Sequence, residues 1–225
     1  MKKKNNFTIT ILSSVVGLLP LILSIVVYNE LPEQIAIHWN SAGNPDNFVP
    51  KTIAAFGMPF LFLVLNIVSK ARLYNDPKRA DASQTMRAIF AWLIPISSVI
   101  AVPITLFISM GKNIPIAVII PALVGAVLVI YGNYLPKSRR NYTIGLKLPW
   151  TLHNANNWNK THRLAGYLWI LGGIALTISA FVANGNPVIG ILLTVIMVIL
   201  LVIIPACYSY FLHRKTGDTV QENKK

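Results

Sequence analysis

Histidines are the side chains in this sequence best suited to binding a metal or moving a proton. His38 lies near Glu33 and Asp46, but one histidine among scattered carboxylates lacks a diagnostic metal-ligand spacing. His153 and His162 share a second segment, without a nucleophile and an orienting acid that could be assigned beside them. The sequence therefore predicts no metal site, no cofactor and no enzyme, and His38 is interpreted as a structural or ligand-facing side chain.

Known catalytic motifs are also missing from the sequence. It contains no GxSxG nucleophile turn, no HExxH zinc motif and no GxxxxGK[ST] phosphate loop. The single cysteine, Cys207, has no second cysteine for an intramolecular disulfide and no cluster of metal ligands. We interpret it as a small packing residue.

Residues 28–51 form the first of two long polar segments. The stretch Gln34–Trp39 has the character of a short strand, and residues 40–46 are dense in turn formers. Gly43 is the residue there that adopts a positive φ most readily. The acidic residues of the segment outnumber its one lysine, Lys51, which favours a cationic partner.

Residues 136–163 form the second long polar segment. Its Trp150 and Trp158 are predicted at the level of the lipid headgroups, with nearby lysines and arginines reaching phosphates. If the end of the segment is helical, Trp158 and His162 share one helix face. An interfacial anchor and a binding role explain these residues equally well.

The elements that position both segments are predicted to be membrane helices. Hydrophobic residues make up 54% of the 225 residues and charged residues only 12%. The apolar residues form six runs, each close to the roughly 20 residues that a helix needs to cross a bilayer. Because only helices satisfy their backbone within one segment, the fold class is an all-α six-helix membrane bundle. The runs are Phe7–Val27, Thr52–Ser69, Ala88–Ser109, Ile114–Leu135, Leu164–Ala183 and Val188–Leu212.

Lysines and arginines predict the direction of these spans. With the N-terminus in the cytoplasm, every one except Lys51 and Lys112 falls in a cytoplasmic segment, as the positive-inside rule expects. The C-terminus is then also cytoplasmic, residues 28–51 face outside and residues 136–163 face inside. Since the +13 charge flanks apolar runs, it indicates contact with the lipid bilayer rather than nucleic acid.

Residues in and next to the two polar segments form two recognisable blocks. The first comprises Leu31, Pro32, Ile35, His38, Trp39, Asn40, Gly43 and Asp46, and the second comprises Gly132, Asn133, Pro136, Asn141, Gly145, Pro149, Trp150, Thr151, Leu152, Trp158, Thr161, His162, Arg163 and Gly166. In this order, with six spans, they resemble the SdpI family of bacterial immunity proteins, including its short N-terminal domain of unknown function. One departure is Leu146-Lys147, where isoleucine and arginine are expected. The charge is kept, but a bidentate arginine contact would be lost.

The resemblance implies a plasma-membrane protein that protects a bacterium from a secreted antimicrobial peptide, the sporulation-delaying toxin. It also implies signalling, with a small soluble repressor held at the membrane. The candidate ligand-binding residues outside are His38, Trp39, Asn40, Gly43 and Asp46. The candidate functional residues inside are Asn141, Gly145, Pro149, Trp150, Thr151, Trp158, Thr161, His162 and Arg163.

A small transporter of peptides or other solutes is the alternative function. The six runs contain no ionisable side chain of the kind that marks ion paths, which favours immunity over transport. Several runs contain proline, which membrane helices tolerate, and Gly172-Gly173 indicates close helix packing. The predicted organisation is a two-helix unit with its outer loop, residues 1–69, followed by a four-helix region, residues 70–225.

Overall fold

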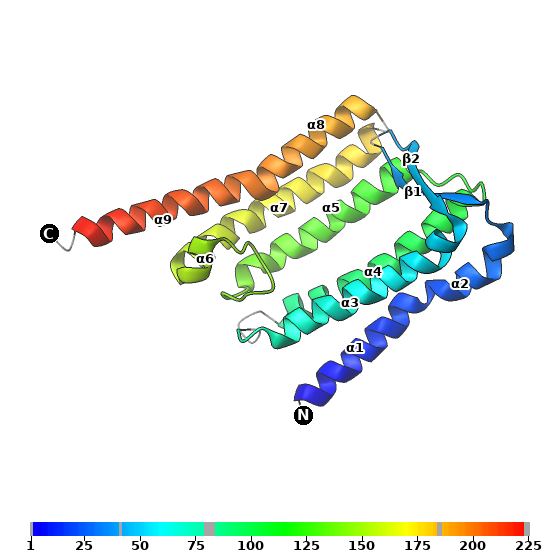
Figure 1. The fold of residues 1–225 in the computed structure, drawn as a ribbon. Helices are drawn as coiled ribbons and strands as arrows, with labels where there is room; N and C mark the ends of the chain where they lie inside the picture. The colour runs from blue at the N-terminus through cyan, green and yellow to red at the C-terminus, as the bar shows by residue number, and fades with distance from the viewer. Residues whose placement is uncertain (1, 41, 79–83, 184–185, 223–225) are drawn as a thin grey trace. The chain divides into compact units, whose positions relative to one another are not determined.

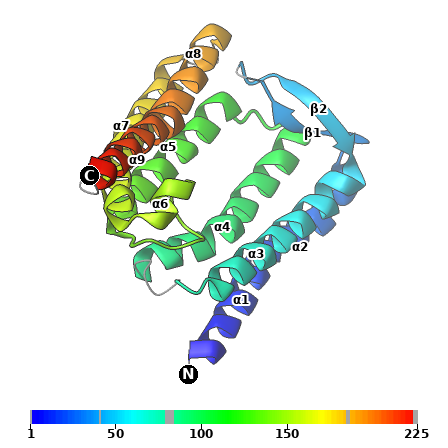
Figure 2. The ribbon, with the colours of Figure 1, turned by 60° about the vertical axis from the view of Figure 1, so that its left-hand side comes forward.

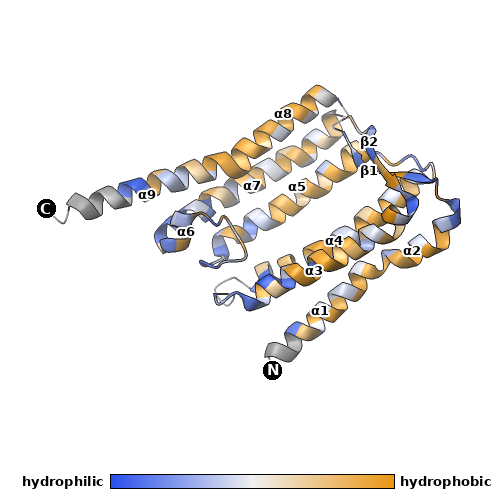
Figure 3. Ribbon diagram, in the orientation of Figure 1, coloured by the Kyte–Doolittle hydropathy of each residue, from blue (hydrophilic) through white to orange (hydrophobic). Residues whose placement is uncertain are grey.

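The computed structural model describes residues 2–40, 42–78, 84–183 and 186–222, and side chains for 6–40, 42–78, 84–182, 186 and 188–215. Six helical stretches within these residues are long and apolar enough to cross a bilayer, which confirms the predicted helical membrane bundle. They are Asn6–Glu30, Ile53–Asn75, Gln84–Ser109, Ile116–Lys137, Ala155–Val182 and Val188–Lys215. Figure 3 shows their apolar character. Of the flanking charges, Arg79, Lys224 and Lys225 lie outside the described residues.

The chain divides into two compact units, which are described separately. Unit 1 comprises residues 1–75 and 88–117, and unit 2 comprises residues 76–87 and 118–225. The third span therefore groups mostly with the first two by compactness. The predicted division into residues 1–69 and 70–225 was based on the order of the spans and on the family resemblance, not on compactness. It stays a prediction.

Unit 1 holds a small two-stranded sheet between its first two spans. Figures 1 and 2 show this hairpin between the end of α2 and the start of α3. It is the exception to the all-α prediction, although the strand at Gln34–Trp39 was expected. The elements are α1 (Lys2–Leu18), α2 (Pro20–Val27), the 3-10 turn η1 (Tyr28–Glu30), β1 (Gln34–Trp39), β2 (Pro45–Pro50), the π-helical turn η2 (Ile53–Gly57), α3 (Met58–Asn75) and α4 (Gln84–Ser109).

Polar side chains join the three spans of unit 1. Ser98 of α4 donates a hydrogen bond to the carbonyl of Gly17 at 2.7 Å, and Asn66 of α3 donates to Ser13 of α1 at 3.2 Å. Lys70 of α3 is 1% exposed and belongs to the same network. It was predicted to lie in a cytoplasmic segment beyond the second span, but α3 continues to Asn75 and holds its ammonium group among helices.

Unit 2 contains the remaining spans and the second polar segment. α8, η5 and α9 follow one another without a break in the helical chain, and η5 is a second π-helical turn. The fifth helix begins at Ala155 rather than Leu164, so the end of the polar segment forms its first turns, as expected. The elements are α5 (Ile116–Tyr134), the 3-10 turn η4 (Leu135–Lys137), α6 (Pro149–His153), α7 (Ala155–Ala183), α8 (Pro187–Val198), η5 (Ile199–Ile203) and α9 (Ile204–Glu222).

Glycines bring α5 and α7 into direct backbone contact. A Cβ built on Gly173 of α7 would lie 2.5 Å from the carbonyl oxygen of Gly125, and a Cβ on Gly132 would lie 2.8 Å from that of Gly166. Residues Gly125 and Gly132 lie seven apart on α5, as do Gly166 and Gly173 on α7, so each pair lines one helix face. This confirms the close packing expected at Gly173.

Candidate functional site

One face of the hairpin is buried on the helices of unit 1. Ile35 of β1 is completely buried, and Ile37 and Val49 pack against the same cluster. The other buried members come from the ends of the spans that flank the hairpin and from α4, and they are Val27, Leu31, Ala54, Ala55, Val102 and Leu106. The hairpin is thus seated on helices rather than extending freely into solvent.

Two polar contacts close the base of the hairpin. The hydroxyl groups of Tyr28 and Thr52 lie 2.9 Å apart, and Lys51 forms an ion pair with Glu33 at 2.9 Å. The hydrogen bond that the Lys51 ammonium donates to the Glu33 carboxylate raises the pKa of Lys51 above its ordinary value. The backbone N–H of Lys51 also donates to the Glu33 carbonyl. These contacts hold together the start of β1 and the end of β2.

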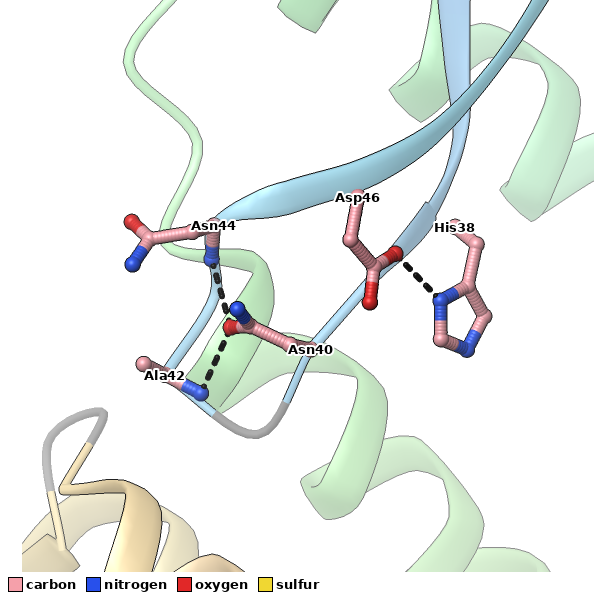
Figure 4. A network of polar contacts seen from close by, with 5 residues as sticks. All are labelled: His38, Asn40, Ala42, Asn44 and Asp46. Carbon is pink, nitrogen blue, oxygen red and sulfur yellow. Dashed lines mark hydrogen bonds and ion pairs between the residues drawn. The ribbon is translucent and has the colours of Figure 1, made fainter.

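Asn40 organises the turn between the strands (Figure 4). Its side-chain oxygen accepts hydrogen bonds from the N–H groups of Ala42 and Asn44, at 3.0 and 3.1 Å. Gly43 has φ +81°, as its expected role requires, and a Cβ there would lie 3.0 Å from the Cβ of Ala117. Glycine at position 43 thus satisfies both the backbone conformation and the close contact.

His38 and Asp46 form an exposed pair across the strands, with 2.6 Å between Nδ1 and Oδ1 (Figure 4). Their side chains are 66% and 41% exposed. Trp39 beside them is half-buried and pairs with Pro45. The pair lies on the surface of the hairpin. Among the described residues no group of three side chains that could hold a metal ion occurs.

In unit 2, Asn141 shapes the first half of the second polar segment. Its side-chain oxygen accepts from the N–H groups of Thr143 and Ile144, at 3.0 and 2.7 Å. Its amide nitrogen donates to the carbonyl of Arg139 at 2.9 Å. Because the side chain is almost fully buried, these bonds replace contacts with water and hold the segment in one conformation.

His162, Trp158 and Gly145 form the centre of this folded segment. The rings of Trp158 and His162 stack with centroids 3.8 Å apart, and Trp158 Nε1 donates to the Ser138 carbonyl at 2.8 Å. Gly145 has φ +114°, and a Cβ there would overlap His162 Nε2. Trp158 is completely buried, so its side chain does not contact lipid headgroups, and its level in the membrane stays a prediction. The protein itself supplies the partner for its indole N–H.

The hydrogen bonds of His162 define its tautomer. Nε2 lies 3.0 Å from the N–H of Leu146 and must accept from it, since a backbone N–H can only donate. Nδ1 lies 2.8 Å from the carbonyl oxygen of Trp158 and must therefore carry the proton. A neutral imidazole in this tautomer ties the segment to α7, and protonation of Nε2 would break the bond to Leu146.

Thr151 closes the second half of the segment. Its hydroxyl accepts from the N–H of Leu148 at 2.9 Å and lies 2.8 Å from the carbonyl of Leu146. Pro149 occupies the first position of α6, where its missing N–H costs nothing. These residues, too, shape the backbone.

Three of the predicted residues lie apart from this centre. Thr161 donates to Asn157, which is bonded to Ser209 of α9. Trp150 packs against α9, with its ring centroid 5.5 Å from that of Tyr210. Arg163 is exposed on α7. The structure thus brings together Asn141, Gly145, Thr151, Trp158 and His162.

Asp76 is a further residue of this site, which the sequence did not indicate. Its side chain is buried, with 6% of the residue exposed. Its carboxylate accepts hydrogen bonds from the backbone N–H of Tyr142 at 2.9 Å and from the hydroxyl of Thr143 at 2.7 Å. It also accepts from the backbone N–H of Lys78. It ties residues 76–78 to the second polar segment. Asp76 is far in sequence from that segment, so no sequence pattern indicated their contact. The only weak signal was that Asp76 is an acidic residue among many basic ones.

Lys70 is the second residue that the sequence did not indicate. Its ammonium group donates to Ser13 Oγ at 2.5 Å, Asn66 Oδ1 at 2.7 Å and the Ala91 carbonyl at 2.7 Å. All three acceptors are neutral. The spacing of Asn66 and Lys70, four residues apart, was the only sequence signal that they share a helix face.

Comparisons with known proteins agree with this architecture. Residues 137–209 match the SdpI/YfhL protein family, and residues 15–63 match a domain of unknown function, DUF1648. The chain is 29% identical over 214 residues to the immunity protein SdpI of Bacillus subtilis (strain 168), covering 93% of this chain and 98% of that protein. No solved structure matches the chain.

Six apolar helices with two folded connecting segments define a multi-pass membrane protein. The DUF1648 match covers the hairpin and parts of its two flanking spans, and the SdpI/YfhL match covers nearly all of the second segment, the fifth span and most of the sixth. The chain resembles the SdpI family, as the sequence indicated, and resides in the bacterial plasma membrane.

Proposed function

We propose that this protein makes its cell immune to a secreted antimicrobial peptide, with the hairpin on the outer surface as the peptide-binding element. The similarity to the SdpI immunity protein over nearly the whole chain supports this function. The observation that carries it is the hairpin itself. Its residues are held by a buried face, a closed base and a bonded turn, so little conformational entropy is lost when a ligand binds.

Survival of a sensitive bacterium tests this proposal. Cells that express the protein should grow at concentrations of sporulation-delaying toxin that kill cells with an empty vector. His38→Ala and Trp39→Ala should reduce protection while the protein still reaches the membrane. Toxin sensitivity equal to that of the empty vector, with normal amounts of intact protein in the membrane, would refute immunity to this toxin.

We propose further that the folded segment of unit 2 faces the cytoplasm and binds a small soluble repressor. Asn141, His162 and Thr151 bond to its backbone and give it a defined surface. That surface carries exposed basic side chains, among them Arg139 and Lys147. An acidic patch on the repressor would complement it. Co-purification of a repressor with the intact protein, lost in Arg139→Glu, tests this role.

Transport remains a second candidate function because of Lys70. The predicted second span ended at Ser69 and contained no ionisable residue, but the helix continues to Asn75 and buries Lys70. An ionisable side chain buried among membrane helices is often part of an ion path. Peptide uptake or proton flux in proteoliposomes, abolished by Lys70→Met, would favour transport. Without flux, Lys70 acts as a link among α1, α3 and α4.

A further inference from the structure

Exposed apolar side chains outside the spans are rare in this protein. Of the large hydrophobic side chains that are exposed in the described residues, all but two lie within the six spans, where lipid covers them. The exceptions are Phe48 on β2, which is 51% exposed, and Tyr142 in the second polar segment. Because both residues lie outside the spans, contact with the bilayer core does not account for the exposure of their side chains.

Phe48 lies on the face of the hairpin opposite the buried one. Because side chains alternate along a strand and Val49 packs on the helices, Phe48 points away from them. It pairs across the ladder with Ala36, which has a small side chain. The His38–Asp46 pair lies two residues further toward the turn on each strand, beyond an irregularity of the ladder. The result is an aromatic ring on a rigid support with charged groups beside it.

A partner is expected to meet this face rather than extend the sheet. Pro45 and Pro50 occupy the two ends of β2 and have no N–H group. Proline on an edge strand removes donors that an added strand would need. Contact through the Phe48 side chain avoids this restriction.

The charge of the segment indicates the chemistry of the partner. Residues 28–51 contain the acids Glu30, Glu33 and Asp46 and one lysine, Lys51. Lys51 is paired with Glu33, so Glu30 and Asp46 account for the excess negative charge of the segment. The carboxylates repel anionic lipid headgroups and attract cations. A cationic peptide fits this surface better than a lipid surface does.

We propose that Phe48 is the apolar anchor for a cationic peptide that docks on this face, with the carboxylate of Asp46 attracting its basic groups. This proposal rests on the proposed immunity function and assigns it a contact residue. Aromatic side chains at the centre of an interface commonly carry most of its binding energy. Tyr142 belongs to unit 2 and provides a matched control.

Binding of synthetic sporulation-delaying peptide to the purified full-length protein in lipid nanodiscs tests the anchor. Phe48→Ser is expected to raise Kd at least about tenfold, whereas Phe48→Leu, which keeps an apolar side chain, should stay within about threefold. Tyr142→Ser and the neighbouring Asn47→Ser should each stay within about twofold. Asp46→Asn should weaken binding at low salt and have less effect at high salt.

The outcomes separate this proposal from the immunity function. Unchanged affinity in Phe48→Ser, with the wild type both binding and protecting, overturns the anchor and leaves immunity standing. Binding that depends on Phe48 without protection of cells refutes immunity and supports the docking face. Equal losses in Phe48→Ser and Phe48→Leu overturn the anchor in favour of a folding role. If Phe48→Ser changes how the protein associates with lipid in the absence of peptide, but leaves peptide binding unchanged, then Phe48 contacts lipid. That result also overturns the proposed anchor.

Discussion

At the scale of single residues, the second polar segment depends on groups that bond to backbone. Asn141, Thr151 and His162 each satisfy N–H groups of a chain stretch without regular structure. Such groups are costly to bury unpaired, so a buried irregular segment needs side chains of this kind. The candidate functional residues of this segment are therefore first of all the residues that fold it.

Gly145→Ala is predicted to disrupt this segment. The substitution places a Cβ on His162 Nε2 and forces a side chain into φ +114°, so the expected loss of stability is roughly 2–5 kcal/mol. Thermal unfolding in detergent measures the change. Gly111→Ala is the matched control, because Gly111 has φ +81° but no atom within 4 Å of the added Cβ. Its expected cost is about 1–2 kcal/mol from the backbone alone. Equal losses in both variants would mean that the contact with His162 contributes nothing.

Residue identity predicted only part of this site. Gly43 was expected at positive φ because turn formers surround it, and the structure confirms that value. Trp158 was placed at the headgroups because tryptophan prefers that environment in general. The carbonyl of Ser138 and the ring of His162 provide a closer partner, and only the folded chain brings them to Trp158.

At the scale of helices, close approach in unit 2 is decided by which glycine faces a neighbour. Gly172 and Gly173 are adjacent in sequence, but they point to different helices. A Cβ on Gly173 would meet the backbone of Gly125 at 2.5 Å, whereas a Cβ on Gly172 would meet the flexible Met197 side chain at 3.4 Å. Lipid offers no hydrophobic drive for association, so packing of this kind holds the helices together.

Gly173→Ala should therefore destabilise the protein and Gly172→Ala should not. The alanine at 173 must push α5 away from α7, with an expected cost of roughly 1–3 kcal/mol. At 172 the methionine can move aside, and the change is expected to stay within about 0.5 kcal/mol. Thermal midpoints of the two variants in the same detergent make the comparison. Similar midpoints would show that α5 and α7 are not in close contact there.

Helix ends were predicted less well than helix existence. α3 extends to Asn75 and α7 starts at Ala155, and each extension carries a polar residue into the helix, Lys70 and His162 respectively. Apolar runs mark the part of a helix that lipid can cover. They do not mark turns whose polar side chains are satisfied by other helices, so Lys70 was assigned to a loop.

At the scale of the whole molecule, the direction of the chain in the membrane decides which partners each segment meets. The prediction rests on lysines and arginines, all but two of which lie on one side of the six spans. The hairpin then faces outside and the folded segment of unit 2 faces inside. A peptide from the medium can reach only the former.

Cysteine labelling of intact cells measures this direction. In a Cys207→Ser background, Ala42→Cys should react with a membrane-impermeant maleimide and Ala155→Cys should react only after the cells are opened. Both positions are at least partly accessible in the folded protein, so burial alone does not prevent reaction. The reverse pattern would place the hairpin in the cytoplasm and remove the proposed site for a secreted peptide.

The sequence by itself determined that there are six membrane helices and where the turn of the hairpin falls, because entry into lipid and local turn formation depend on the composition of one segment. Tertiary structure alone decided that Lys70, Asp76 and Trp158 are buried and bonded. Each of these side chains is satisfied by groups distant in sequence, and only packing brings such groups within hydrogen-bonding distance.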